Sequence, residues 1–227
     1  CWIYPNAHGS LNVVGAIEHS CNNFFYELGY QMGLTGVTTT NATTGDTEEM
    51  RSDTLGLETL EKYAVMFGLG ESTGIEIPET DPQISDSDSI RSSIGQGTNN
   101  YSTAQLARYV TTIANKGPVY QLSTLDKIVD VDANLVEDYT PEVQNKITEV
   151  SNSTWTAVHQ GMRAVVAESS TYQSLGSFEM SGKTGTAQQS RTHANHGLFI
   201  GYAPSNDPEV AFAVRITNGY QSAYASQ

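Results

Sequence analysis

Basic residues, cysteine and long apolar runs are all scarce in this chain of 227 residues. Its 11 Lys and Arg residues stand against 25 Asp and Glu residues, which gives a formal net charge of −14. A chain so acidic lacks the basic face that nucleic acid or an anionic lipid surface requires. The longest apolar runs, Tyr63–Leu69 and Val210–Val214, are far shorter than the roughly 20 residues of a membrane helix, and no charged-then-apolar leader opens the chain. Two cysteines, Cys1 and Cys21, allow one bridge at most, which excludes a disulfide framework.

What remains is a composition that can form a folded core, with 38% hydrophobic and 16% charged residues. Apolar residues recur with helical spacing in five segments: 11–17, 24–32, 57–67, 106–113 and 155–165. Strand-like runs follow at Phe178–Gln188, His196–Ala203 and Glu209–Thr217, with a tight turn at Pro204–Pro208 between the last two. Helices followed by an antiparallel meander predict an α+β fold in which helices cover a sheet.

Two local features refine this prediction. Ser102 and Gln105 have the spacing of a capping box, so a helix should begin there, and Gly117 stands where the C′ residue of that helix is expected. Val119–Val131 alternates loosely like a strand or hairpin. The segment Thr35–Asp53 is rich in Thr, Gly and Asn, and we expect a long surface loop or excursion there.

The run Ser181–Thr186 reads Ser-Gly-Lys-Thr-Gly-Thr and admits two interpretations. A phosphate-binding P-loop needs a glycine five residues before Gly-Lys-Thr and a helix after it, and both are missing. The alternative is a strand that lines a site. Regular alternation then places Lys183 and Gly185 on one face and Thr184 and Thr186 on the other. Gly185 leaves room for a substrate backbone to approach.

The charge around this run favours an anion site. No Asp or Glu occurs from Met180 to Asn206, whereas Lys183, Arg191 and two histidines do. In a chain with a net charge of −14, this positive segment suits a substrate carboxylate. A surface strand with incidental charges is the competing explanation.

A Ser-x-Asn tripeptide, Ser20-Cys21-Asn22, lies at a break between two predicted helices, where side chains can point into a cleft. A second copy, Ser10-Leu11-Asn12, starts an ordinary amphipathic helix, so Ser20 and Asn22 are the better candidates. Short polar residues at helix ends also serve as simple caps, which is the structural alternative.

Together these segments resemble the transpeptidase domain of penicillin-binding proteins, specifically the monofunctional class B elongation type. Three stretches carry the resemblance in the family's order: Ser20–Phe25, Ile94–Gly97 with the helix that follows it, and Ser181–Ala187. The family's motifs are Ser-x-x-Lys, Ser-x-Asn and Lys-Thr-Gly. The first is missing, because no lysine here has a serine three residues before it.

The resemblance implies a penicillin-binding/β-lactamase-like fold that is incomplete on its N-terminal side. Residues 1–227 would be one transpeptidase domain fragment, without the upstream Ser-x-x-Lys portion and the closing C-terminal helix. The family's activity is acyl transfer from D-Ala-D-Ala stem peptides, which cross-links peptidoglycan, and this fragment alone would be inactive. The resemblance implies four catalytic residues. Ser20 would relay a proton and Asn22 would hold the substrate amide. Lys183 would supply positive charge near the substrate carboxylate, and the Thr186 N–H would donate a hydrogen bond to the oxyanion. Thr184, Gly185 and Thr186 would bind the substrate, the two threonines through its carboxylate.

Stem peptides and β-lactam antibiotics are the implied ligands, with no cofactor. The whole protein would be anchored at the extracytoplasmic face of the bacterial cell membrane, within a cell-wall synthesis complex. His193 and His196 have a spacing that a metal could use, but no third ligand is indicated, and Cys21 is expected to be a buried, unreactive thiol. Two other functions stay open: a relative that hydrolyses or senses β-lactams, and a noncatalytic cell-wall interaction module.

Overall fold

A computed structural model describes residues 3–169, 171–172, 178–190 and 192–220. Cys1, Arg191 and the glycine considered for the P-loop, Gly176, lie outside these ranges. The elements are α1 (Val13–Glu18), α2 (Asn22–Gln31), β1 (Leu34–Thr40), β2 (Thr47–Arg51), α3 (Asp53–Met66), α4 (Ser89–Ser92), α5 (Thr103–Ala114), β3 (Pro118–Tyr120), β4 (Lys127–Val129), β5 (Leu135–Asp138), β6 (Val143–Lys146), α6 (Asn152–Ala167), β7 (Ser181–Ala187), β8 (His196–Ala203) and β9 (Val210–Ile216).

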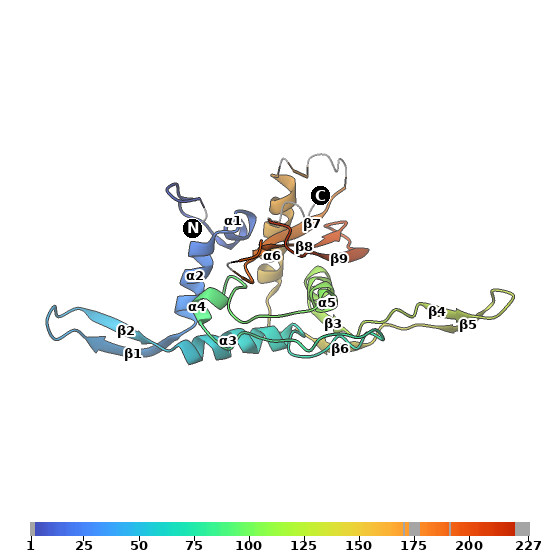
Figure 1. The fold of residues 1–227 in the computed structure, drawn as a ribbon, viewed down its shortest axis with the longest axis horizontal. Helices are drawn as coiled ribbons and strands as arrows, with labels where there is room; N and C mark the ends of the chain where they lie inside the picture. Colours follow the sequence, from blue (N-terminus) through green and yellow to red (C-terminus); the bar gives the residue numbers. More distant parts are fainter. Residues whose placement is uncertain (1–2, 170, 173–177, 191, 221–227) are drawn as a thin grey trace.

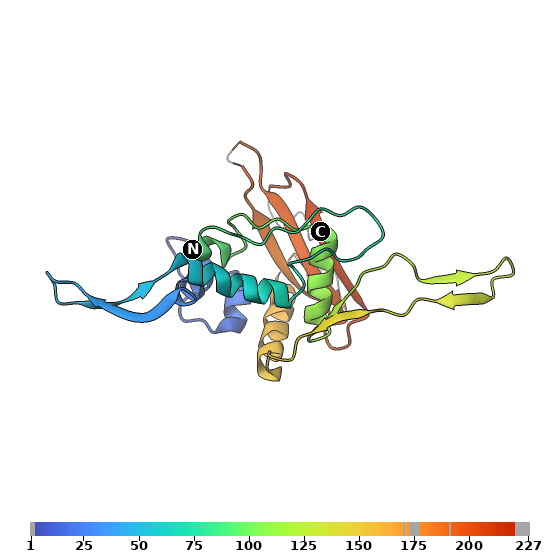
Figure 2. The same ribbon diagram turned by 90° about the horizontal axis from the view of Figure 1, so that it is seen from below.

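The body of the molecule is an antiparallel sheet packed on helices. Strands β7, β8 and β9 pair in chain order, so the predicted meander is confirmed. Helix α5 packs against β8 and β9, α6 packs against β7, and α1 lies along α6. Two hairpins, β1–β2 and β4–β5, project from opposite ends of this body in both views (Figures 1 and 2).

The core lies between the sheet and helices α5 and α6. Val110 and Ile113 of α5 and Met162 of α6 pack with the fully buried Tyr202 of β8. A second cluster joins Phe199 of β8 to the end of α6 and to Tyr172, and a third surrounds Trp155. The helical stripes predicted at 106–113 and 155–165 are therefore the surfaces that pack against the sheet.

The predicted start of α5 is confirmed and its predicted end is off by one residue. Ser102 and Gln105 form the capping box, each side chain bonding to the other's backbone N–H. The residue with left-handed backbone after the helix is Lys116, with φ +58°, and Gly117 follows it. The N–H groups of Lys116 and Gly117 bond to the carbonyls of Ile113 and Thr112, which is a Schellman motif displaced by one position.

The segment Thr35–Asp53, predicted to be a long surface loop or excursion, is an exposed excursion, but it is a paired hairpin, β1–β2, and not a loop. Its turn is held by Asn41, whose side chain accepts the N–H groups of Thr43 and Thr44. The threonines suit a pleated strand, but nearly every residue is exposed on both faces, so no apolar alternation marks the strands. No helix in the described ranges is long and apolar enough to cross a membrane.

Candidate active site

Ser20 lies in the turn that joins α1 to α2, as the sequence predicted. The Ser20 N–H bonds to the carbonyl of Ile17 at 3.2 Å, and the Cys21 N–H bonds to that of Ala16 at 3.0 Å. This is a Schellman motif with Ser20 in the left-handed position, at φ +49°. A non-glycine residue is uncommon in this conformation, and it sets the direction of the hydroxyl.

Lys183 lies on β7, an edge strand within the described sheet. It stands opposite Ile200 of β8, and directly paired residues share a face of the sheet. Ile200 packs on the cluster formed by α5 and α6, so Lys183 is on the helix-covered face. The residue before Lys183 must be a glycine for β7 and β8 to pack as they do. A Cβ at Gly182 would come within 2.4 Å of the Phe199 ring and 2.9 Å of the Ile200 carbonyl oxygen.

The structure brings these two candidates together across 163 positions of sequence. The Lys183 Nζ donates a hydrogen bond to the Ser20 Oγ and a second, at 2.9 Å, to the Thr184 carbonyl oxygen. Burial lowers the pKa of the Lys183 amine from 10.5 to about 8. The amine is therefore mainly charged at neutral pH, and a modest further shift would allow it to exchange a proton.

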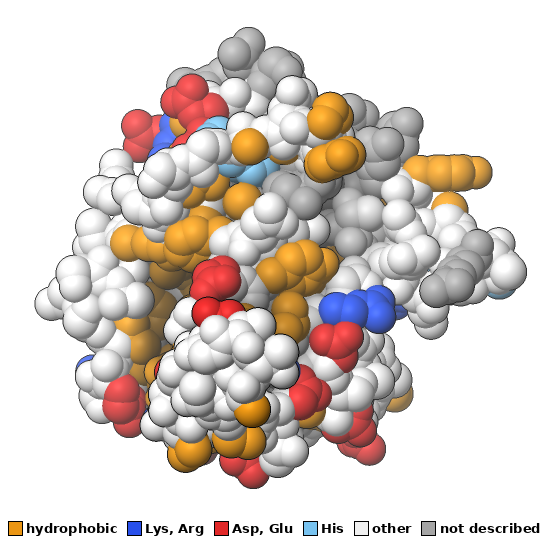
Figure 3. All heavy atoms as spheres, turned by 90° about the vertical axis from the view of Figure 1, so that its left-hand side faces the viewer, with side chains coloured by type: hydrophobic (Ala, Val, Ile, Leu, Met, Phe, Trp, Pro, Cys, Tyr) orange, Lys and Arg blue, Asp and Glu red, His pale blue; other side chains and the backbone are white. Residues whose placement is uncertain are grey.

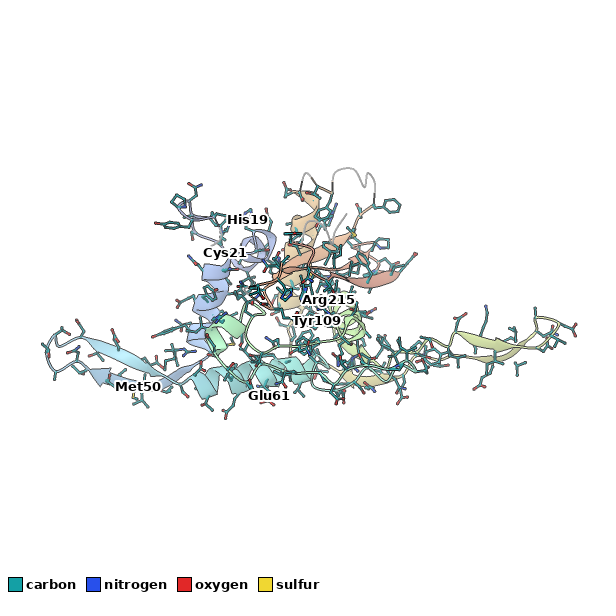
Figure 4. The ribbon with its side chains drawn as sticks, viewed as in Figure 1. His19, Cys21, Met50, Glu61, Tyr109 and Arg215 are labelled. Atoms are coloured by element: carbon teal, nitrogen blue, oxygen red, sulfur yellow. The ribbon has the colours of Figure 1, made fainter. Side chains whose placement is uncertain are left out.

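Asn22 and Cys21 follow from the start of α2. Cys21 is the N-cap, and its carbonyl accepts the first helical N–H bonds, from Phe24 and Phe25. Its thiol is free and 7% exposed, which agrees with the expected buried role. Asn22 is the first helical residue, and its partly buried side chain bonds to no described residue. Figure 4 shows Cys21 beside His19 at the junction of α1 and α2.

The remaining motif residues lie along β7 after Lys183. Thr184 stands opposite Phe199 and so faces the other side of the sheet from Lys183, as alternation predicts, while Thr186 is exposed near the end of the strand. The Thr184 carbonyl accepts the hydrogen bond from the Lys183 amine described above. Gly185 is uncrowded, since a Cβ there would be in ordinary contact with Leu198, at 3.4 Å.

One residue that positions the site was not singled out from the sequence. Gly161 of α6 lies directly against Ile17 of α1, and a Cβ at Gly161 would come within 2.8 Å of the Ile17 Cβ. Helix α1 can therefore approach α6 closely, which carries the Ser20 turn toward the sheet. The sequence signal was available, because a glycine interrupts an apolar helical stripe where a close helix contact is common.

The positive segment predicted around Lys183 is only partly a feature of the site. His196 is 6% exposed; its Nδ1 accepts the Asn218 N–H at 3.0 Å, and its Nε2 therefore donates to the Gln189 Oε1 at 2.6 Å. These two hydrogen bonds hold the His196 ring and fix the connection between β7 and β8. His193 is exposed. In the described ranges, no three His, Cys, Asp or Glu side chains are grouped as a metal site would require.

The segment around Ile94–Gly97 lies against α2, the helix that begins at Asn22. The Ser93 Oγ, one residue before it, donates to the Phe25 carbonyl at 2.7 Å and so joins the end of α4 to α2. On the other side of α2, a hollow of about 440 Å³ is lined by Gly9, Leu11, Cys21, Asn23, Phe24, Glu27, Leu28 and Gln31. Figure 3 shows apolar side chains gathered on this side of the molecule.

Known proteins are similar to this chain over nearly its whole length. A family model described as the penicillin binding protein transpeptidase domain matches residues 2–227. Penicillin-binding protein 2B of Streptococcus pneumoniae is 30% identical over 246 residues, covering 95% of this chain and 35% of that protein. Penicillin-binding protein H of Bacillus subtilis is 30% identical over 226 residues, covering 91% of this chain and 31% of that protein. The chain thus spans about a third of the length of these relatives.

Solved structures share the fold. Penicillin-binding protein 2B from Streptococcus pneumoniae strain R6 matches with a TM-score of 0.71 and 27% identity, over 95% of this chain and 38% of that one. PBPA from Mycobacterium tuberculosis matches with a TM-score of 0.75 and 21% identity, over 97% of this chain and 50% of that one. The α+β prediction, with an antiparallel sheet covered by helices, is confirmed. The chain belongs to the penicillin-binding protein transpeptidase domain family.

Proposed function

We propose that this chain is the part of a peptidoglycan D,D-transpeptidase that carries the second and third catalytic motifs. The observation that carries the proposal is the hydrogen bond between the Lys183 amine and the Ser20 hydroxyl, made by two motifs from opposite ends of the chain. A buried lysine amine bonded to a serine hydroxyl is suited to moving protons beside a reacting bond.

The nucleophile would be the serine of a Ser-x-x-Lys motif outside these 227 residues, since no lysine here has a serine three residues before it. That serine attacks the carbonyl carbon of the D-Ala-D-Ala bond, and the terminal D-Ala leaves as the free amine once it has gained a proton. An amine of a neighbouring stem peptide then attacks the acyl-enzyme, which releases the serine and forms the cross-link.

The residues described here would act at defined points of this reaction. Ser20 would relay a proton to the leaving amine, with Lys183 keeping its hydroxyl oriented, and Asn22 would hold the substrate amide. The positive charge of Lys183 would attract the terminal carboxylate, and the hydroxyls of Thr184 and Thr186, which start from the other face of β7, would reach it around the free edge of that strand. The Thr186 N–H would be one of two oxyanion donors, each worth about 2.7–4 kcal/mol of barrier.

The substrate would lie along the outer edge of β7, where Gly185 leaves space for its backbone. The apolar hollow beside α2 would be covered by the segment that bears the nucleophile, because Leu28 at its rim is 46% exposed. We further propose that the whole protein acts at the extracytoplasmic face of the cell membrane, anchored there in a cell-wall synthesis complex, and that β-lactams acylate the same serine. No cofactor takes part.

Benzylpenicillin tests this proposal. We expect the 227-residue chain to gain no covalent adduct by intact-mass spectrometry, and the protein that also carries Ser-x-x-Lys to gain one acyl group, stable for many minutes. An adduct mapped to Ser20, or to any other serine of this chain, would refute the proposed division of the site. Rapid turnover of the antibiotic would instead assign a β-lactam hydrolase, and a folded but inert longer protein would assign a noncatalytic module.

A further inference from the structure

The strands of the β4–β5 hairpin are exposed in the part of the chain that the structure describes. All seven of its strand residues are exposed, and in the described structure its two strands pair only with each other. It projects from the body on the side away from β1–β2 (Figures 1 and 2). A two-stranded sheet is only marginally stable in water, and a third strand or a packed face is what normally stabilises it.

The hairpin presents apolar side chains to solvent. Val129 and Leu135 are directly paired and so share one face, on which Leu135 is 59% exposed. Ile128 and Glu137 pair on the opposite face, and Val136 is the extra residue of a bulge in β5. The outer edge of β5 therefore offers Leu135 on one face and Glu137 on the other, and Asp138, paired with Lys127, follows Leu135 on the first face.

The tip of the hairpin is held in one conformation by Asp130. Its carboxylate accepts the N–H groups of Asp132 at 2.9 Å and Asn134 at 2.8 Å, and also the Asn134 side-chain amide at 2.9 Å. These bonds lower the pKa of Asp130, so it remains ionised. The two strands are thus already arranged for pairing, which reduces the entropy lost when a partner binds.

The acidic residues of the hairpin favour a basic partner over a second copy of this chain. Lys127 is the one basic residue between positions 126 and 142, against six acidic residues: Asp126, Asp130, Asp132, Glu137, Asp138 and Glu142. A second copy of this chain would bring the same acidic hairpin and a net charge of −14, and like charges placed opposite each other destabilise a pairing. A basic partner would be attracted by the same residues.

We propose that the outer edge of β5 receives an extended segment of another protein in which apolar and basic residues alternate. Successive side chains of an added strand point to opposite faces. The apolar residues of the partner would lie on the face of Leu135 and its pair Val129. The basic residues would lie on the opposite face, beside Glu137. The acidic residues keep copies of this chain apart and favour the basic partner.

A fluorescein-labelled octapeptide of alternating Val and Lys is the probe, and fluorescence anisotropy with the 227-residue chain is the measurement. We expect it to bind, and the matched Val–Glu and Ser–Lys octapeptides to bind at least 10-fold more weakly. Leu135→Ser and Glu137→Lys should each weaken binding at least 10-fold. Val37→Ser and Glu48→Lys are the matched controls on the β1–β2 hairpin. Each replaces an exposed residue of the same chemical class with the same new residue, and neither should change binding.

Three results would overturn the proposal. Equal losses for Glu137→Lys and Glu48→Lys would mean that diffuse attraction to an acidic chain explains the binding. Binding of the Ser–Lys peptide as tight as that of the Val–Lys peptide would remove the role of the apolar face. Self-association of the chain in sedimentation, abolished by Leu135→Ser, would make a second copy the occupant. Leu135 lies outside the described core clusters, so far-UV circular dichroism should show its variant folded.

Discussion

Replacing Lys183 by methionine should separate the stability of the domain from its chemistry. Methionine keeps much of the apolar stem and removes the amine, whose pKa is lowered to about 8 by burial. The difference from the ordinary value of 10.5 corresponds to about 3 kcal/mol of unfavourable desolvation below pH 8. The hydrogen bonds to Ser20 and Thr184 offset a similar amount, because bonds from a charged donor contribute about 1.5–3 kcal/mol each.

At pH 7, Lys183→Met should therefore change the free energy of unfolding by less than about 2 kcal/mol in either direction. In the protein that also carries Ser-x-x-Lys, the penicillin acylation rate should fall by about 10²–10³, as is usual when one preorganised electrostatic contact is removed. A rate within about 3-fold of wild type, less than about 1 kcal/mol of barrier, would show that Lys183 is not part of the site.

The same pair of proteins gives a characteristic dependence on pH. Because the pKa of Lys183 is lower in the folded state, the unfolded chain binds more protons between pH 8 and 10.5, and stability must rise with pH across that window. Urea unfolding at pH 7 and pH 10 should show the wild type gaining about 2.5 kcal/mol relative to Lys183→Met. Tyrosine ionisation cancels in this comparison. A difference that does not depend on pH would refute the lowered pKa of Lys183.

Two further substitutions test how the scaffold supports the site. Ser102→Ala removes the capping box of α5 and should destabilise the chain by about 1–2 kcal/mol, whereas Thr103→Ala, at the exposed next position, should change it by less than about 0.5 kcal/mol; equal effects in urea unfolding would contradict the capping role. Gly161→Ala should cost about 1–3 kcal/mol, because the new Cβ collides with Ile17, and should lower the acylation rate more than 10-fold by displacing Ser20. A fully active Gly161→Ala protein would show that the contact between α1 and α6 does not position Ser20.

The parts of the fold that the sequence predicted well are those determined by local chemistry. The capping box at Ser102, the helix start at Asn12 and the strand pattern of His196–Ala203 depend on residues close in sequence, and all three are confirmed. Asn12 caps α1 by accepting the Gly15 N–H at 3.0 Å, so the first Ser-x-Asn copy begins a helix, as expected.

The parts that were missed depend on tertiary context. The β1–β2 hairpin has nothing to bury, so its strands carry no periodic signal. His196 looked like part of a cationic segment, but its ring is buried and committed to the Gln189 and Asn218 contacts. Spacing alone could not predict that Lys183 and Ser20 meet, because no local rule connects positions 163 residues apart. That prediction came from a family resemblance.

The site joins two arrangements that are each unfavourable by themselves. Ser20 holds a backbone conformation that costs a non-glycine residue about 1 kcal/mol or more, and Lys183 holds a charged amine in a buried place. Each persists because the surrounding structure fixes it: α1 is fixed by its contact with Gly161, and β7 by pairing with β8 along its whole length. The hydrogen bond between the two side chains forms only when both supports are in place. The geometry of these two side chains is therefore a property of the packed domain, which is why we expect substitutions in α6, away from the motifs, to affect the proposed chemistry.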